Sequence, residues 1–314
     1  MSGKEPRILA PDAEGVAEAA ALLRAGQLVA IPTETVYGLA ARADSAEAVA
    51  RIYRAKGRPE FNPLIVHVGS LEMAQRLAQF GQRALDLADR YWPGPLTLVL
   101  PARADGGIAR AVTAGLPTIA LRQPAHPVAA RILAETGVPL AAPSANRSYA
   151  VSPTRPAHVL ASFGADSPPV VDGGPCTEGL ESTIVALRPG GGWQMLRPGP
   201  VSHEELGLLL GPEEKSRGAT VEAPGQLAKH YSPGKPVILD CGEPLPDSFV
   251  IGFGAVTGDV NLSADGDLAE AAARLYDCLH QAAASPCPII CVAPIPHYGM
   301  GDAINDRLRR AEAS

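Results

Sequence analysis

The spacing of apolar and polar residues predicts a chain of alternating helices and short strands. Residues 12–25 repeat apolar side chains at helical intervals and stop at Gly26, and the apolar run 28–32 follows directly. A second helix is expected at 45–56 and a second strand at 64–68. This alternation predicts an α/β fold.

The same alternation continues through most of the chain. Further strands are expected at 96–100, 118–121, 138–142, 182–187 and 194–196, with helices at 71–79 and 84–91. Another helix is expected to begin near Pro156, and Ser152 or Thr154 is its expected N-cap.

The pattern breaks into a polar stretch rich in proline and glycine before it resumes near the C-terminus. Beyond this stretch, strands are expected at 237–240, 249–254 and 289–293, and helices at 266–284 and 301–312. We therefore expect a first domain at 1–210, a linker at 211–236 and a small α/β domain at 237–314. A length of 314 residues also suggests about two domains.

Charge and composition narrow the class of protein. A net charge of -6 argues against a protein that binds nucleic acid over its whole surface. The charged N-terminus does not resemble a signal peptide, and no run of about 18 apolar residues occurs, so a cytoplasmic protein is expected. The cysteines lack a CxxC pair, which predicts free thiols; Cys287 and Cys291 are expected to be buried strand positions rather than zinc ligands.

Two loops carry the first candidates for chemistry. Thr33, Glu34 and Thr35 follow the strand 28–32, and Lys56 and Arg58 lie on a second loop. Lys56 is the sole lysine between residues 5 and 214, and its ammonium group suits phosphate oxygens, to which Arg58 can add bidentate contact. The alternative is a solvated pair at a helix end, which the helix dipole favours.

Two more residues end apolar runs. Arg122 follows the strand 118–121, where it can recognise a carboxylate or form a salt bridge with a neighbouring loop. His67 follows the apolar run 64–66. By itself, a histidine at such a position is more typical of the edge of a core than of a ligand site. Walker A, dinucleotide-binding and nucleophile-elbow motifs are absent from the sequence, which disfavours the corresponding enzyme classes.

Eight short motifs contain most of these candidates. They are Pro32-Thr33-Glu34-Thr35-Val36-Tyr37-Gly38-Leu39, Lys56-Gly57-Arg58-Pro59 with Asn62-Pro63-Leu64, Pro93-Gly94-Pro95-Leu96-Thr97, Ala120-Leu121-Arg122, Ala142-Pro143-Ser144-Ala145-Asn146, Ser152-Pro153-Thr154, Glu181-Ser182-Thr183 and Leu196-Arg197-Pro198-Gly199. In order and spacing they resemble the YrdC-like family. Two later segments, His230-Tyr231-Ser232-Pro233-Gly234 and Ile304-Asn305-Asp306-Arg307-Leu308, resemble its longer, two-domain form.

The resemblance implies both a fold and a reaction. The expected fold is a twisted, open α/β sheet with a positively lined concave cavity, joined by an ordered linker to a small Rossmann-like domain. The expected activity is that of a threonylcarbamoyl-AMP synthase, a nucleotidyltransferase that converts L-threonine, bicarbonate and ATP into threonylcarbamoyl-AMP and pyrophosphate. Mg²⁺ would come with ATP, and the product would pass to the machinery that makes threonylcarbamoyladenosine in tRNA.

The resemblance also assigns residues to the substrates. Catalysis and phosphate binding are expected at Lys56 and Arg58, and phosphate binding also at Arg197. The rest of ATP is expected to contact Asn62, Thr118, Ser144, Asn146, Ser152 and Tyr231. Threonine is expected to contact Thr35, His67, Arg122 and Ser182, with Thr33 as the alternative to Thr35. No metal ligand is assigned to a protein side chain.

The linker acquires a function under this interpretation. Residues 223–234 are expected to fold over the cavity as a lid, with Tyr231 against the nucleotide and His230 as a second candidate. Tyr149 stands where the family has a glycine, which puts the path of that loop in question, and Glu34 receives no role. An RNA-binding module is disfavoured by the acidity of the chain, and a carbamoyltransferase of hydrogenase maturation by the missing CxxC pairs and acylphosphatase segment.

Overall fold

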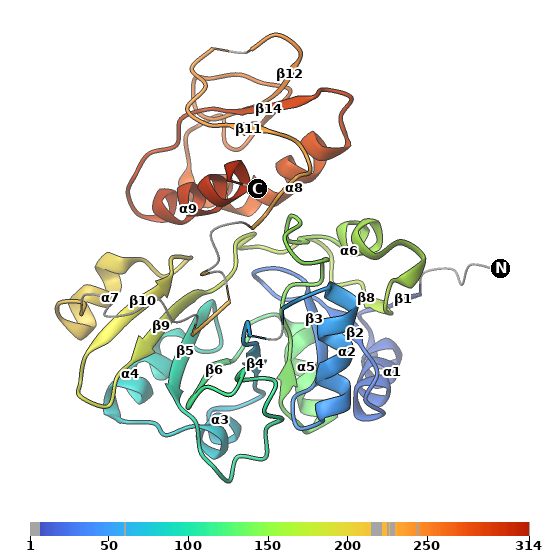
Figure 1. Cartoon of the computed structure of the whole chain (residues 1–314), viewed down its shortest axis with the longest axis vertical. Helices are drawn as coiled ribbons and strands as arrows, with labels where there is room; N and C mark the ends of the chain where they lie inside the picture. The colour runs from blue at the N-terminus through green and yellow to red at the C-terminus, as the bar shows by residue number, and fades with distance from the viewer. Residues whose placement is uncertain are drawn as a thin grey trace.

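The computed structural model describes residues 7–59, 61–214, 222–224, 226, 230–243 and 245–313, and these form two β-sheets (Figure 1). The larger sheet consists of β1 (Ile8–Leu9), β2 (Val29–Ile31), β3 (Gly38–Arg42), β4 (Ile65–His67), β5 (Leu96–Pro101), β6 (Thr118–Arg122), β7 (Leu140–Ala141), β8 (Val170–Val171), β9 (Thr183–Leu187) and β10 (Trp193–Arg197). Its order is β1-β8-β2-β3-β7-β4-β6-β5-β9-β10. The sheet is mixed: β4 and β6 are parallel, whereas β5 and β6 are antiparallel.

Helices cover the two halves of this sheet differently. The helices of the first domain are α1 (Ala13–Arg24), α2 (Ala46–Lys56), α3 (Leu71–Leu77), α4 (Gln82–Tyr91), α5 (Pro127–Thr136), α6 (Pro156–Phe163) and α7 (His203–Leu210), with a 3₁₀ turn at Gly164–Asp166. Around β2 and β3, α1 and α5 pack on one face while α2 and α6 pack on the other. Around β4, β5, β6 and β9, helices α2, α3 and α4 pack on a single face.

Strand alternation determines which residues face away from those helices. Val66 and Leu121 point into the helical layer. Because successive side chains on a strand point to opposite faces, Ile65, Ala120 and Ile184 point the other way and form a separate apolar cluster. His67 and Arg122 come two positions after Ile65 and Ala120 on the same strands, so their side chains lie on this same face.

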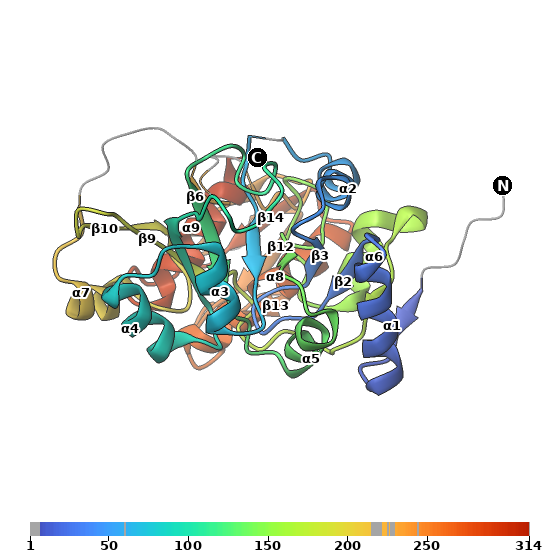
Figure 2. The same ribbon diagram turned by 90° about the horizontal axis from the view of Figure 1, so that it is seen from below.

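A second sheet forms a small domain near the C-terminus. It contains β11 (Val237–Ile238), β12 (Ser248–Gly252), β13 (Val260–Asn261) and β14 (Ile289–Val292), all parallel and in the order β11-β14-β12-β13. Its helices are α8 (Leu268–Ala284) and α9 (Met300–Glu312). In Figure 1 these two helices lie between the small sheet and the first domain, and Figure 2 shows them behind the larger sheet when the molecule is seen from below.

The two domains share a packed interface. Val36, Val151 and Leu180 of the first domain belong to the hydrophobic cluster of the second. Gly179 approaches α8 so closely that an added Cβ would lie 2.4 Å from the Cα of Ala273, and its φ of 68° also favours glycine. The docking of α8 against the first domain therefore depends on this backbone-to-backbone approach.

Most predicted elements are confirmed, with ends that differ by a few residues. Ser45 is the N-cap of α2 and Ser70 is the N-cap of α3. Gly26, with a φ of 75°, follows the end of α1. The sequence pattern does not predict β1, β3, β8, β13, α5 or α7. The glycine and alanines of β3 carry little periodic signal, so the pattern does not mark this strand. The domain boundaries at 210 and 236 stay predictions.

Two expectations are wrong in detail. Neither Ser152 nor Thr154 caps α6, whose N-cap is Arg155 without a side-chain cap bond; the Ser152 hydroxyl instead donates to the buried carboxylate of Glu181, at 2.6 Å. A hydrogen bond donated to a charged carboxylate is stronger than the neutral bond that a capping hydroxyl accepts from a backbone N–H group. Cys287 precedes β14 and is half-buried, so only Cys291 is a buried strand position. Within the described part of the chain, no helix is long and apolar enough to cross a membrane.

Candidate active site

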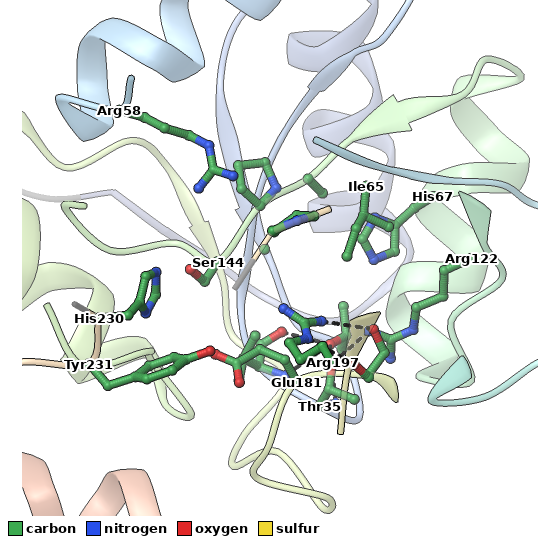
Figure 3. A pocket seen from close by; sticks show the side chains of 17 residues that line it. Thr35, Arg58, Ile65, His67, Arg122, Ser144, Glu181, Arg197, His230 and Tyr231 are labelled. Carbon is green, nitrogen blue, oxygen red and sulfur yellow. Dashed lines mark hydrogen bonds between the residues drawn. The ribbon is translucent and has the colours of Figure 1, made fainter. Parts of the chain in front are cut away.

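Strand ends and loops bring polar side chains together in one cavity on the face opposite α3 and α4 (Figure 3). His67 ends β4 and Arg122 ends β6, and the parallel register of these strands places the two residues side by side. Ser182 precedes β9, and Arg197 ends the antiparallel neighbour β10. Adjacent strands therefore deliver cations and hydroxyls to the same face.

Arg122 forms a buried salt bridge with the loop that follows β2. Its Nη2 donates to Glu34 Oε1 at 2.6 Å, its Nη1 to Thr35 Oγ1 at 2.8 Å and its Nε to the Gly94 carbonyl at 3.1 Å. Burial would raise the pKa of Glu34, but the charge and hydrogen bond of Arg122 hold that pKa below its usual value. The salt-bridge alternative is confirmed, and Glu34 acquires a role in holding the guanidinium group.

His67 lies beside this pair and is neutral. Burial lowers its pKa to about 3, and the charge of Arg122 acts in the same direction. Its Nδ1 is buried and has no hydrogen-bond partner among the described residues. The ring can therefore give or accept one hydrogen bond within the cavity, according to its tautomer.

Arg197 lines the cavity and is held there by hydrogen bonds to Ser182. Its Nε donates to the Ser182 carbonyl at 3.0 Å and its Nη2 to Ser182 Oγ at 3.1 Å. Ser182 Oγ also lies 2.7 Å from Thr97 Oγ1. Burial lowers the pKa of Arg197, yet an arginine stays charged at neutral pH because its ordinary pKa is so high. A fixed cation thus faces the cavity.

Arg58 supplies a second cation, on the opposite side of the cavity from Glu181 and Arg197 in Figure 3. Its Nη2 donates to the Pro63 carbonyl at 3.0 Å and its Nε to the Asn62 carbonyl at 3.3 Å. Burial lowers its pKa to about 10, so the guanidinium remains protonated at neutral pH. The carbonyls orient the side chain without neutralising it.

Lys56 lies outside the cavity lining. Its Nζ donates to the carbonyl oxygens of Ser144, at 2.6 Å, and Asn146, at 2.5 Å. Burial lowers its pKa well below the ordinary value, and the charge of Arg58 contributes. In this arrangement the ammonium holds the 144–146 loop, on which Ser144 lines the cavity.

Glu181 is a cavity residue that the sequence did not single out. Its Oε1 accepts from Ser152 Oγ, and its Oε2 accepts from Tyr276 Oη at 2.7 Å and from Arg307 Nε at 3.1 Å. Burial would raise its pKa, but the charges of Arg307 and Arg197 hold it at about 2. An ionised carboxylate therefore stands beside Arg197, with partners from the second domain.

The described part of the linker reaches the cavity. Pro224, His230 and Tyr231 line it, and in Figure 3 the Tyr231 hydroxyl points toward Glu181. The Tyr231 ring stacks on Tyr276 with centroids 5.5 Å apart. Burial lowers the pKa of His230 to about 3. Residues 225 and 227–229 of the predicted lid lie outside the described residues.

The cavity collects eight of the predicted site residues: Thr35, Arg58, His67, Arg122, Ser144, Ser182, Arg197 and Tyr231. Thr33, the alternative to Thr35, also lines it, and its hydroxyl lies 2.9 Å from that of Thr35. Five predicted residues do not line it: Lys56, Asn62, Thr118, Asn146 and Ser152. Thr118 begins β6, whose other end carries Arg122. The signal that could have found Glu181 is its place in the motif 181–183.

The described residues contain no group of three or more histidine, cysteine, aspartate or glutamate side chains placed to hold a metal ion. All five cysteines are free thiols. The site thus offers fixed cations, hydroxyls and a neutral imidazole. Such a set suits the binding of anions and of a small polar molecule.

Two family models together match nearly the whole chain. One, described as "Telomere recombination" for Sua5, YciO and YrdC proteins, matches residues 21–199. The other, described as "Threonylcarbamoyl-AMP synthase, C-terminal domain", matches residues 201–313. Apart from β1, the larger sheet thus lies within the first match, and the smaller sheet lies within the second.

Curated relatives and solved structures agree. The threonylcarbamoyl-AMP synthase of Bacillus subtilis is 38% identical over 94% of this chain and 92% of its own length, and that of Pyrococcus abyssi is 38% identical over 93% and 92%. The crystal structure of P. abyssi Sua5 complexed with L-threonine has a TM-score of 0.88 at 35% identity, covering 99% of this chain and 98% of that one. E. coli YciO, 19% identical with a TM-score of 0.53, shares the fold of the first domain. The chain belongs to the two-domain, YrdC-like family of threonylcarbamoyl-AMP synthases.

Proposed function

We propose that the protein joins L-threonine, bicarbonate and ATP into threonylcarbamoyl-AMP with release of pyrophosphate. The observation that carries the proposal is a row of cations along one cavity: Arg122, bonded to Thr35, lies on one side, Arg58 lies on the other, and Arg197 lies between them (Figure 3). The relatives named above are synthases of this product, and the P. abyssi structure contains L-threonine.

The chemistry requires fixed positive charge. The amine of threonine captures carbon dioxide, and the resulting carbamate must then attack the α-phosphate of ATP. Two anions meet in this step, so immobile cations lower the barrier by screening their repulsion and by stabilising the charge on the leaving pyrophosphate. The hydrogen bonds of Arg58 and Arg197 go to neutral oxygens, so neither guanidinium is used up in a direct ion pair.

Threonine fits the end that Arg122 occupies. Although Arg122 is bonded to Glu34, Thr35 and Gly94, each of its terminal nitrogens retains one N–H, because a guanidinium has five such donors. Those two N–H groups can bind the threonine carboxylate. Ser182 would add a contact to the carboxylate, while Thr35 and the neutral ring of His67 would contact the amine and hydroxyl groups.

The nucleotide fits the end between Arg58 and Tyr231. Arg58, Ser144 and Tyr231 line the cavity on the side away from Arg122, and Arg197 lies between the two sides (Figure 3). The phosphate contact of Lys56 stays a prediction, since its ammonium is bonded to two backbone carbonyls. Contacts from Asn62, Thr118, Asn146 and Ser152 likewise stay predictions.

Mg²⁺ enters as the ATP–Mg²⁺ complex. The two carboxylates nearest the cavity, Glu34 and Glu181, are paired with Arg122 and Arg307. The phosphates would therefore supply most of the ligands of the ion. The product would pass in the cytoplasm to the transferase that modifies tRNA, and the linker residues His230 and Tyr231 would exclude water from the mixed anhydride before that transfer.

The test is pyrophosphate release by the purified full-length chain. Release should require ATP–Mg²⁺, bicarbonate and L-threonine together, and L-valine should not replace threonine. Arg58→Met should reduce kcat/KM by about 100-fold or more. Arg54→Met is the matched control, because Arg54 is exposed on α2, the helix that ends just before Arg58. Release that does not depend on threonine would refute the proposal.

A further inference from the structure

A buried arginine of the second domain contacts the site described above. Arg307 lies on α9, yet its side chain is 0% exposed. Removing a guanidinium group from water is unfavourable by several kcal/mol unless its charge is neutralised and its N–H groups are bonded. Its charge is compensated by Asp306 beside it and by Glu181 of the first domain, while its Nη2 has no hydrogen-bond partner among the described residues.

Arg307 contacts the cavity wall and the linker at once. Its Nε donates to Glu181 Oε2 at 3.1 Å, and its Nη1 donates to Asp306 Oδ2 at 2.8 Å. Its guanidinium carbon lies 5.7 Å from the centroid of the Tyr231 ring, within cation–π distance. One side chain of α9 thus joins a first-domain carboxylate to a linker tyrosine, and both of these residues line the cavity.

The contact with Glu181 affects the charge available to the substrate. Glu181 is an ionised, buried carboxylate beside Arg197. If Arg307 were absent, Arg197 would be left to offset the charge of Glu181, and uncompensated negative charge would face the phosphates. With Arg307 in place, Arg197 keeps its bonds to Ser182 and its charge toward the cavity.

We propose that Arg307 is a positioning residue of the reaction, which holds Glu181 and Tyr231 in place so that the nucleotide end of the cavity is complete only with α9 docked. This inference rests on the proposed function, because it assigns ATP to that end. It gives the second domain a specific part in the site, through a single buried side chain.

The competing explanation is that Arg307 only joins the two domains. In that case its loss would lower the fraction of folded protein, so kcat would fall while the KM values for ATP and threonine stayed unchanged. A positioning role instead raises the KM for ATP more than the KM for threonine, because Arg122, to which threonine is assigned, lies on the other side of the cavity from Tyr231 (Figure 3).

The experiment uses the full-length chain with Arg307→Met, Glu181→Gln and the double variant. Arg309→Met is the matched control, since Arg309 is exposed on the same helix. Steady-state pyrophosphate release measures the KM values for ATP and threonine. Hydrogen exchange of the Ser232 amide, which donates to the Tyr149 carbonyl at 2.7 Å, reports the placement of the linker without any substrate.

Arg307→Met is expected to raise the KM for ATP about tenfold and that for threonine less than about threefold. The Ser232 amide should exchange faster, and the double variant should recover at least part of the ATP affinity, since no buried charge is then left unpaired. An unchanged KM for ATP, unchanged exchange at Ser232, or strictly additive single effects would overturn the proposal. If Arg307→Met does not fold, Arg307→Gln takes its place, because its amide can still donate an N–H group to Glu181. An unchanged KM for ATP in Arg307→Gln would likewise overturn the proposal.

The two proposals fail separately. If the wild-type chain shows no threonine-dependent release, the proposed function is wrong, whereas hydrogen exchange at Ser232 still tests whether Arg307 positions the linker. If the wild type is active and Arg307→Met equals Arg309→Met in both measurements, only the positioning role is wrong.

Discussion

Replacement of Arg122 by leucine tests how much the buried ion pair stabilises the first domain. The substitution removes the 2.6 Å contact with Glu34, the 2.8 Å contact with Thr35 and the 3.1 Å contact with the Gly94 carbonyl. Both members of the pair are nearly inaccessible, with side-chain exposures of 4% and 8%. The carboxylate of Glu34 would be left in the interior without its cation.

The expected loss of stability follows from that burial. Removing one member of a buried ion pair destabilises a protein by about 3–5 kcal/mol, because the remaining charge is neither solvated nor paired. The pair Arg103–Asp105 provides an exposed comparison, with a contact of 3.1 Å and exposures of 45% and 74%. Solvent screens such a pair, so Arg103→Leu should change stability by less than about 1 kcal/mol.

Urea unfolding followed by circular dichroism measures both variants and the double variant Glu34→Gln/Arg122→Leu. The double variant should recover more than about 1 kcal/mol relative to Arg122→Leu alone, because a neutral amide replaces the unpaired carboxylate. If Arg122→Leu is no more harmful than Arg103→Leu, or if the double variant is simply additive, the pair does not stabilise the site as its geometry implies.

Three further predictions concern other parts of the site. Lys56→Met should destabilise the chain by about 1–3 kcal/mol in urea unfolding, because it removes the ammonium that bonds one buried and one part-buried carbonyl. Lost activity with unchanged stability would instead favour a direct phosphate contact. Tyr149 has a φ of 71°, so Tyr149→Gly should raise stability by up to about 1 kcal/mol over Tyr149→Ala, which keeps the strained Cβ, and equal melting temperatures would contradict this. The pKa of Glu181 is about 2 in the folded chain, below its ordinary 4.5, so its stabilising contribution is complete above pH 4.5 and is lost as the pH falls toward 2. Between pH 4.5 and 3.5 the wild type should therefore lose stability more steeply than Glu181→Gln, and equal slopes would show that Glu181 is not ionised by its partners.

The sequence by itself determined the elements and the loops that carry chemistry. Apolar spacing located α1, α2, α8 and α9 and most of the strands, because the period of a helix or strand is a local property. The motif residues at strand ends indicated which loops form the site, and eight of those residues line one cavity. The resemblance to the family, rather than periodicity, indicates glycine at the position of Tyr149, and the φ of Tyr149 is positive.

Only the tertiary structure decided what each charged group contacts. Lys56 was expected at phosphate, yet its ammonium is bonded to carbonyls about 90 residues further along the chain. Glu34 pairs with Arg122 because the loop after β2 packs against the end of β6. Glu181 pairs with Arg307, which lies 126 residues further along the chain. Ser152 was expected to cap a helix, but a buried carboxylate accepts its hydroxyl group. The partner of a buried charge is set by packing between distant segments, which a local pattern does not contain.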